Sequence, residues 1–176
     1  YDSILLTGGS TMISAYAALA YTRLAILADP SLMAQANSLI AGLETVKRSD
    51  GYWSASTIQT LADVSATAFI AAHGLCSTAD QLTAGAALAK DYRAGIISHR
   101  GGMRALRSPE TWPPEVNPNA YPADTYVNGG FWWGFRTEWA CQAMAKAGYV
   151  DDARALMSEQ VQGWLAQHRL NGNGPQ

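Results

Sequence analysis

The stretch TYVNGGFWWGFRTEWACQAMAKAGYVDDARALM, residues 125–157, decides the fold prediction for this chain. Its alanine-rich part predicts a helix over residues 130–147, closed by Gly148. A second helix, over 151–168, follows after a very short turn, and two helices joined in this way form an antiparallel hairpin. Two glycines and three aromatic residues stand where the first helix begins. Glycine at that place lets a ligand approach the backbone closely.

Two more helical hairpins are predicted upstream of this one. The first pairs residues 11–28, capped by Ser10, with residues 29–47, where Asp29 is the cap and Pro30 the first helical residue. The second pairs residues 57–73 with a helix that runs from about 77 to 95. No period-two strand is evident, so the predicted class is all-α. One domain is expected over residues 1–170, with a tail or linker over 171–176.

Composition excludes several classes of function. The chain has 176 residues, of which 48% are hydrophobic and 15% charged, and a net charge of −2. This predicts a folded core and no basic surface for nucleic acid. No apolar run is long enough to cross a bilayer. The three histidines lack metal-ligand spacing, and Cys76 and Cys141 are expected to be buried thiols, so no metal or cofactor is predicted. The sequence does not determine the cellular compartment of the protein.

The connections between the hairpins are longer than the turns within them. Residues 48–56 and 96–129 are expected to lie on one rim, together with the amino ends of the first, third and fifth helices. Aromatic rings suit the C–H faces of sugars, and polar groups suit their hydroxyls. The predicted substrate-binding residues are Trp53, Trp112, Tyr126, Asn128, Trp132, Trp133 and Arg136. Glycosidic cleavage needs two carboxylates, and the candidates are Asp124, Glu138 and Asp50.

Structural roles are open for several of these residues. Asp50 precedes a glycine and can simply form an Asx turn. Arg136 either pairs internally or contacts ligand. Trp139 shares a helical face with Trp132, which fits a core stripe as well as a sugar platform. Asp63 lies off the apolar face of the third predicted helix and is expected to be solvated.

The stretch that contains Tyr126, Asn128, Gly129, Gly130 and Trp132 resembles the C-terminal half of a six-hairpin glycosidase, the (α/α)6-toroid superfamily. Many members carry a similar Y-x-N-G-G-x-W stretch at the start of an inner helix. The segment RSDGYWSAS, residues 48–56, is similar to the superfamily's unsaturated glucuronyl hydrolase branch. The resemblance covers about residues 8–167.

This resemblance implies an active site at the amino ends of the inner helices and a carbohydrate substrate. A full toroid has twelve helices, whereas this chain is expected to form about six. The resemblance thus implies a half-toroid, completed by the remainder of a longer chain or by a homo-oligomer. The expected function is glycoside hydrolysis of an oligo- or polysaccharide, although the superfamily also contains phosphorylases and lyases. The alternatives are a carbohydrate-binding protein without catalysis and a helical-repeat interaction protein.

Overall fold

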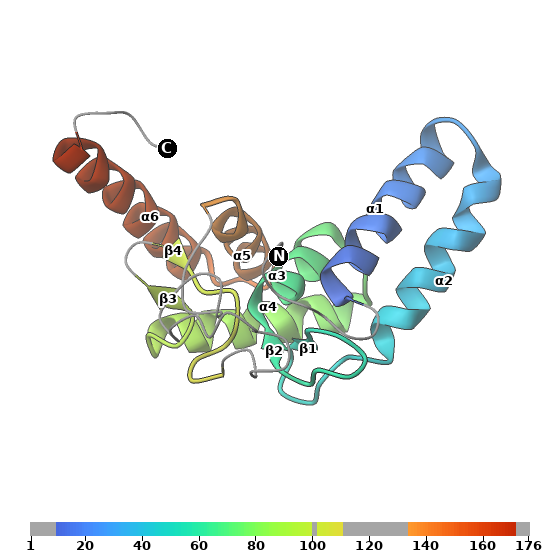
Figure 1. Cartoon of the computed structure of the whole chain (residues 1–176), viewed down its shortest axis with the longest axis horizontal. Helices are drawn as coiled ribbons and strands as arrows, with labels where there is room; N and C mark the ends of the chain where they lie inside the picture. Colours follow the sequence, from blue (N-terminus) through green and yellow to red (C-terminus); the bar gives the residue numbers. More distant parts are fainter. Residues whose placement is uncertain (1–9, 100–101, 111–133, 172–176) are drawn as a thin grey trace.

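The computed structural model describes residues 10–99, 102–110 and 134–171. These ranges contain six α-helices, one short 3-10 helix and four two-residue strands (Figure 1). The helices are α1 (Thr11–Leu27), η1 (Pro30–Leu32), α2 (Met33–Glu44), α3 (Val64–His73), α4 (Thr78–Arg93), α5 (Gly134–Lys146) and α6 (Val150–Asn171). The strands are β1 (Trp53–Ser54), β2 (Ala62–Asp63), β3 (Ser98–His99) and β4 (Gly102–Met103). The mostly helical content confirms the predicted all-α class.

Polar side chains fix several of the helix starts, as the sequence predicted. The hydroxyl of Ser10 accepts the N–H of Ile13 at 3.4 Å and caps α1. The carboxylate of Asp29 accepts the N–H of Ser31 at 3.0 Å, but the turn it caps is the 3-10 helix η1, and α2 starts only at Met33. The predicted second helix was therefore too long at both ends, since α2 ends at Glu44.

The third predicted helix, residues 57–73, was wrong in its first half. The helix α3 starts at Val64, where the carboxylate of Asp63 caps it by accepting the N–H of Ala66 at 2.8 Å. Gly74 ends α3 with φ of +68°, as predicted. Asp63 is only 2% exposed, so the expectation that it is solvated was also wrong. In this buried position the carboxylate satisfies the backbone N–H of Ala66 at the helix start.

Short strands lie in the connections between helices, and one of them, β2, lies where helix was predicted. The strands β1 and β2 are antiparallel, with Trp53 opposite Asp63 and Ser54 opposite Ala62. The strands β3 and β4 form a second antiparallel pair, with Ser98 opposite Met103. The sequence showed no period-two strand, and these strands of two residues leave the described chain mostly helical. Strands of two residues are too short to show the period-two pattern that identifies a strand in a sequence.

The β1–β2 ribbon holds the amino ends of α1 and α3 together. The N–H of Thr11, the first residue of α1, donates to the carbonyl of Ala55 at 3.0 Å. The ribbon continues directly from β2 into α3. On its other side, Val64 donates to the carbonyl of Ala105 at 2.9 Å, and Arg107 donates to the carbonyl of Ala62 at 3.0 Å. The segment after β4 therefore also anchors the start of α3.

The odd-numbered helices lie next to one another. Helix α3 packs against α1 and against α5, whereas α2 packs on α1 and α6 packs on α5. The ammonium of Lys146 donates to the carbonyl of Ala72 at 2.5 Å, so α3 and α5 end at the same place and run in the same direction. Figure 1 shows the α1–α2 hairpin and α6 extending on opposite sides of the central helices α3, α4 and α5.

All six helices contribute to one hydrophobic core. The core also includes Trp53, whose side chain is among the largest that are fully buried, and Tyr52 beside it. Helix α3 is buried from Val64 to Ala72, as expected for the helix at the centre of the molecule. Fully buried core residues of the other helices include Leu43, Leu88, Met144 and Leu156.

Candidate functional site

Four rings from the odd-numbered helices form a continuous aromatic cluster, consisting of Tyr16, Phe69, His73 and Trp139. The ring of Phe69 lies at the centre, with its centroid 4.6 Å from that of Tyr16, 4.8 Å from that of Trp139 and 4.4 Å from that of His73. Tyr16 and Trp139 also meet edge to face at 6.0 Å. Tilted and edge-to-face contacts of this kind are the favoured arrangements of aromatic rings.

The aromatic cluster is partly exposed. Phe69 is only 2% exposed and contacts the other three rings on their buried side. Tyr16 is 43% exposed, and Trp139 and His73 are half-buried. The cluster thus offers a surface on which an apolar face of a ligand can pack, and three different helices position that surface.

Two buried charged residues lie near this cluster, at the amino ends of α3 and α5. Asp63 caps α3, and Arg136 lies in the first turn of α5 and is 7% exposed. Burial raises the pKa of the Tyr16 hydroxyl above its usual value; the positive charge of Arg136 lowers it, and the negative charge of Asp63 raises it. Tyr16 is therefore within electrostatic reach of both groups. Both groups are buried, and they act on the Tyr16 hydroxyl through their charge.

The other end of the cluster is basic. Burial lowers the pKa of His73, and the charges of Arg23 and Lys146 lower it further, while Glu138 acts in the opposite direction. Glu138 is exposed on α5 and accepts a hydrogen bond from the amide of Gln142 at 3.0 Å. Its carboxylate is thus accessible and lies within electrostatic reach of the aromatic cluster.

Asp50 belongs to a different group of charges. The guanidinium of Arg48 donates to both of its carboxylate oxygens, at 3.1 Å from Nε and 2.8 Å from Nη2. This hydrogen bonding holds the pKa of the Asp50 carboxyl below its usual range. Arg48 also lies 3.6 Å from the carboxylate of Glu110 and donates to the carbonyl of Thr60. Asp50 therefore helps to fix the turn before β1, and it stays ionised at neutral pH.

A second buried network lies behind that turn. The hydroxyl of Tyr52 donates to Asp91 on α4 at 2.9 Å, and the guanidinium of Arg107 pairs with the same carboxylate. Asp91 is 2% exposed. The Arg107 guanidinium also lies 5.7 Å from the centre of the Tyr52 ring. This network joins the residue before β1, α4 and the segment after β4, which is a structural role.

The predicted site residues are distributed over several environments. Arg136 and Glu138 both lie on α5 near the aromatic cluster. Trp53 is a core residue: it is 1% exposed, its indole N–H donates to the carbonyl of Leu43 at 3.0 Å, and its ring has no open face for a ligand. The remaining candidates, Asp124, Trp112, Tyr126, Asn128, Trp132 and Trp133, lie outside the described residues.

The sequence alone did not indicate that Tyr16, Phe69 and His73 lie together with Trp139. Each of these residues shares a helix face with apolar neighbours, and this pattern indicates core rather than site. Only the side-by-side packing of α1, α3 and α5 brings the rings together. A signal for Asp63 was present, because an aspartate directly before an apolar helical run is a typical cap.

The described part of the chain offers neither a cluster of metal ligands nor a membrane-spanning helix. No group of three or more potential metal-binding side chains is found there. No described helix is both long and apolar enough to cross a membrane. Cys141 is buried, as predicted, whereas Cys76 is only half-buried, and both are free thiols.

Comparisons with known proteins found no match to a protein family, to a curated protein or to a solved structure.

Proposed function

We propose that this chain binds carbohydrate at the aromatic cluster and acts there as a glycoside hydrolase on an oligo- or polysaccharide. The observation that carries the proposal is that α1, α3 and α5 each supply a ring to one partly exposed surface. Sugars pack their C–H faces on such rings and bind polar groups through their hydroxyls. The partly exposed Tyr16 supplies a hydroxyl, and the buried charges of Asp63 and Arg136 act on that hydroxyl.

The packing of the helices supports the related proposal that the chain forms part of an (α/α) toroid. In a toroid the inner helices neighbour one another, and each is covered by an outer helix. Here α3 packs on α1 and α5, while α2 and α6 cover α1 and α5 from outside. The amino ends of α1 and α3 are joined by the β1–β2 ribbon. The aromatic cluster accordingly lies where the inner face of such a toroid would be.

For the chemical step we propose Glu138 and Asp124 as the pair of carboxylates. Glu138 is exposed next to the aromatic cluster, and Asp124 remains a candidate from the sequence. Cleavage of a glycosidic bond needs one protonated and one ionised carboxyl group. Asp50 fits only the ionised role, because Arg48 lowers its pKa.

Binding is tested first, by titrating oligosaccharides of different composition into the protein in a calorimeter. We expect Trp139→Leu to weaken binding by about 1–3 kcal/mol, by analogy with the loss of an aromatic side chain on which a nucleobase stacks. The matched control is Trp164→Leu, since Trp164 is 39% exposed on α6 and is absent from the aromatic cluster. Equal affinity of the Trp139 variant and the wild type would place the sugar elsewhere.

Turnover is tested next, with the sugar that binds. Glu138→Gln and Asp124→Asn are expected to abolish hydrolysis while binding persists, because each change keeps the shape of the side chain and removes the ionisable group. Binding of sugar by the wild type with no turnover would instead support a carbohydrate-binding protein without catalysis. That alternative is favoured by one observation: Asp63 and Asp50, two of the described carboxylates, are already engaged in a helix cap and an ion pair.

A further inference from the structure

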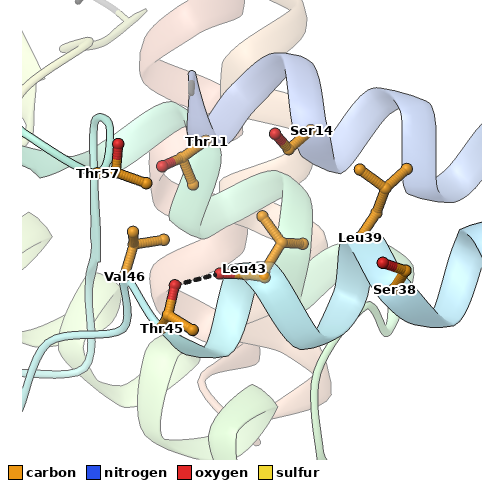
Figure 2. A pocket seen from close by; sticks show the side chains of 9 residues that line it. Thr11, Ser14, Ser38, Leu39, Leu43, Thr45, Val46 and Thr57 are labelled. Atoms are coloured by element: carbon orange, nitrogen blue, oxygen red, sulfur yellow. Dashed lines mark hydrogen bonds between the residues drawn. The ribbon is translucent and has the colours of Figure 1, made fainter. Parts of the chain in front are cut away.

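A second concave site lies between α1 and α2, apart from the aromatic cluster. Its cavity has a volume of about 170 Å³. Figure 2 shows side chains of both helices, and of the segments that follow α2 and β1, pointing toward the same space. The nine lining residues are Thr11, Ser14, Ser38, Leu39, Gly42, Leu43, Thr45, Val46 and Thr57.

The lining is uncharged and combines two kinds of surface. Leu39, Leu43 and Val46 form apolar walls, and hydroxyl groups from the serines and threonines stand among them and at the mouth. The hydroxyl of Thr45 is already engaged, since it donates to the carbonyl of Gly42 at 2.7 Å. Without a cation in the lining, the cavity does not suit an anion, and without a carboxylate or imidazole it does not suit a metal ion.

Thr11 provides an independent indication of a ligand. It is 2% exposed, and its side-chain oxygen has no hydrogen-bond partner within the described part of the chain. Its backbone N–H is satisfied by the carbonyl of Ala55 at 3.0 Å, so the deficit concerns the side chain alone. Buried hydroxyls are normally hydrogen-bonded. A partner delivered through the cavity would remove the deficit.

We infer that this cavity binds a small uncharged polyhydroxy compound, between glycerol and a single sugar ring in size. Such a compound has apolar C–H groups for Leu39, Leu43 and Val46, and hydroxyls that can donate to Thr11 and accept from it. The volume is below that of the pockets that hold drug-sized ligands, so the ligand expected here is no larger than a single sugar ring. The site is separate from the proposed carbohydrate site, and neither depends on the other.

Two substitutions test this site without touching the aromatic cluster. Thr11→Val removes the unpartnered hydroxyl and keeps the shape of the side chain. Gly42→Leu adds a bulky side chain to the lining of the cavity, where a Cβ on Gly42 meets no atom within 4 Å. The matched control is Ala41→Leu, which adds the same side chain on an exposed position of α2 outside the lining.

The measurement is a titration of backbone amide NMR shifts with glycerol and with glucose at millimolar concentrations, and with sulfate as the charged comparison. We expect shifts at Leu39 and Val46 with one of the neutral probes and none with sulfate. Thr11→Val should weaken that binding about tenfold, as loss of one hydrogen bond would, and Gly42→Leu should abolish it. Circular dichroism verifies that each variant is folded.

The inference would be overturned by either of two results. Neutral probes that shift none of the lining amides would mean that the cavity holds only water. Binding that survives Gly42→Leu unchanged would place the probe elsewhere. Loss of oligosaccharide binding in Trp139→Leu bears only on the proposed function, so the two failures can be told apart.

Discussion

Gly85 lies directly against Ala147, at the place where α4 crosses the end of α5. A Cβ added to Gly85 would stand 2.4 Å from the Cβ of Ala147 and 2.5 Å from the carbonyl oxygen of Ala143. Both contacts are too short, and the second involves backbone, which cannot rotate away. We therefore expect Gly85→Ala to destabilise the fold by about 1–3 kcal/mol through overpacking. Urea unfolding followed by circular dichroism measures this change.

Gly42 provides the matched control for this substitution. It also lies inside a helix, but a Cβ there meets no atom within 4 Å. Gly42→Ala should therefore stabilise the protein by about 0.5–1 kcal/mol, because alanine loses less entropy than glycine on forming a helix. Destabilisation of similar size at both positions would contradict the close packing of α4 on α5.

A second prediction concerns the buried network around Asp91. Tyr52→Phe removes one hydrogen bond to that carboxylate but leaves its ion pair with Arg107, so a loss of about 1–2 kcal/mol is expected. Arg107→Gln should cost more, because it removes the counter-charge of a carboxylate that is 2% exposed. Both losses are measured as free energies of unfolding in urea. A larger loss for Tyr52→Phe than for Arg107→Gln would reverse the assigned importance of the two contacts.

The lowered pKa of His73 predicts that the stability of the protein depends on pH. Its pKa in the folded protein is lowered by burial and by the charges of Arg23 and Lys146. The unfolded chain therefore binds the proton more tightly, with a pKa of about 6.5. The stabilisation is complete above that value and decreases as the pH falls toward the lower pKa of the folded protein.

The measurement is the free energy of unfolding between neutral pH and about pH 5, since the window lies just below the ordinary pKa of histidine. His73→Gln should flatten the slope in this window, because glutamine does not titrate. The other two histidines are present in both proteins, so the difference between the two curves isolates His73. Parallel curves would mean that the pKa of His73 is not lowered by folding.

Local signals in the sequence predicted much of this fold. Ser10, Asp29 and Gly74 act where they were expected to act, because capping depends on residues within one turn of the helix end. The start of α3 was misplaced, since Ile58 and Leu61 continue the apolar spacing of the helix but lie in the ribbon around β2. Pairing with β1 and with the segment around Leu106 determines that ribbon, and such contacts are not local.

The candidate site was predicted less completely than the fold. Arg136 and Glu138 were identified because they follow an unusual aromatic stretch on the same helix. Tyr16 and Phe69 belong to other helices, and their proximity results from packing of α1 on α3. Trp53 is a residue type that suits sugar binding, but its side chain lies in the core, where its indole N–H donates to the carbonyl of Leu43. Residue type alone does not distinguish these two environments.

Substitutions of Asp63 can separate two effects of its carboxylate, the cap of α3 and the raised pKa of Tyr16. It caps α3 through the N–H of Ala66, and its negative charge raises the pKa of Tyr16. Asp63→Ala should cost about 1–2 kcal/mol, as the loss of a helix cap does. Asp63→Asn keeps an oxygen that can accept the same hydrogen bond, so its cost in unfolding free energy should be smaller. Because it removes the charge, it should nevertheless lower the pKa of Tyr16. NMR of the tyrosine ring carbons as a function of pH measures that pKa, and Tyr16→Phe assigns the signal. An unchanged Tyr16 pKa in Asp63→Asn would show that the carboxylate does not act on the aromatic cluster, and Asp63 would then be a helix cap alone.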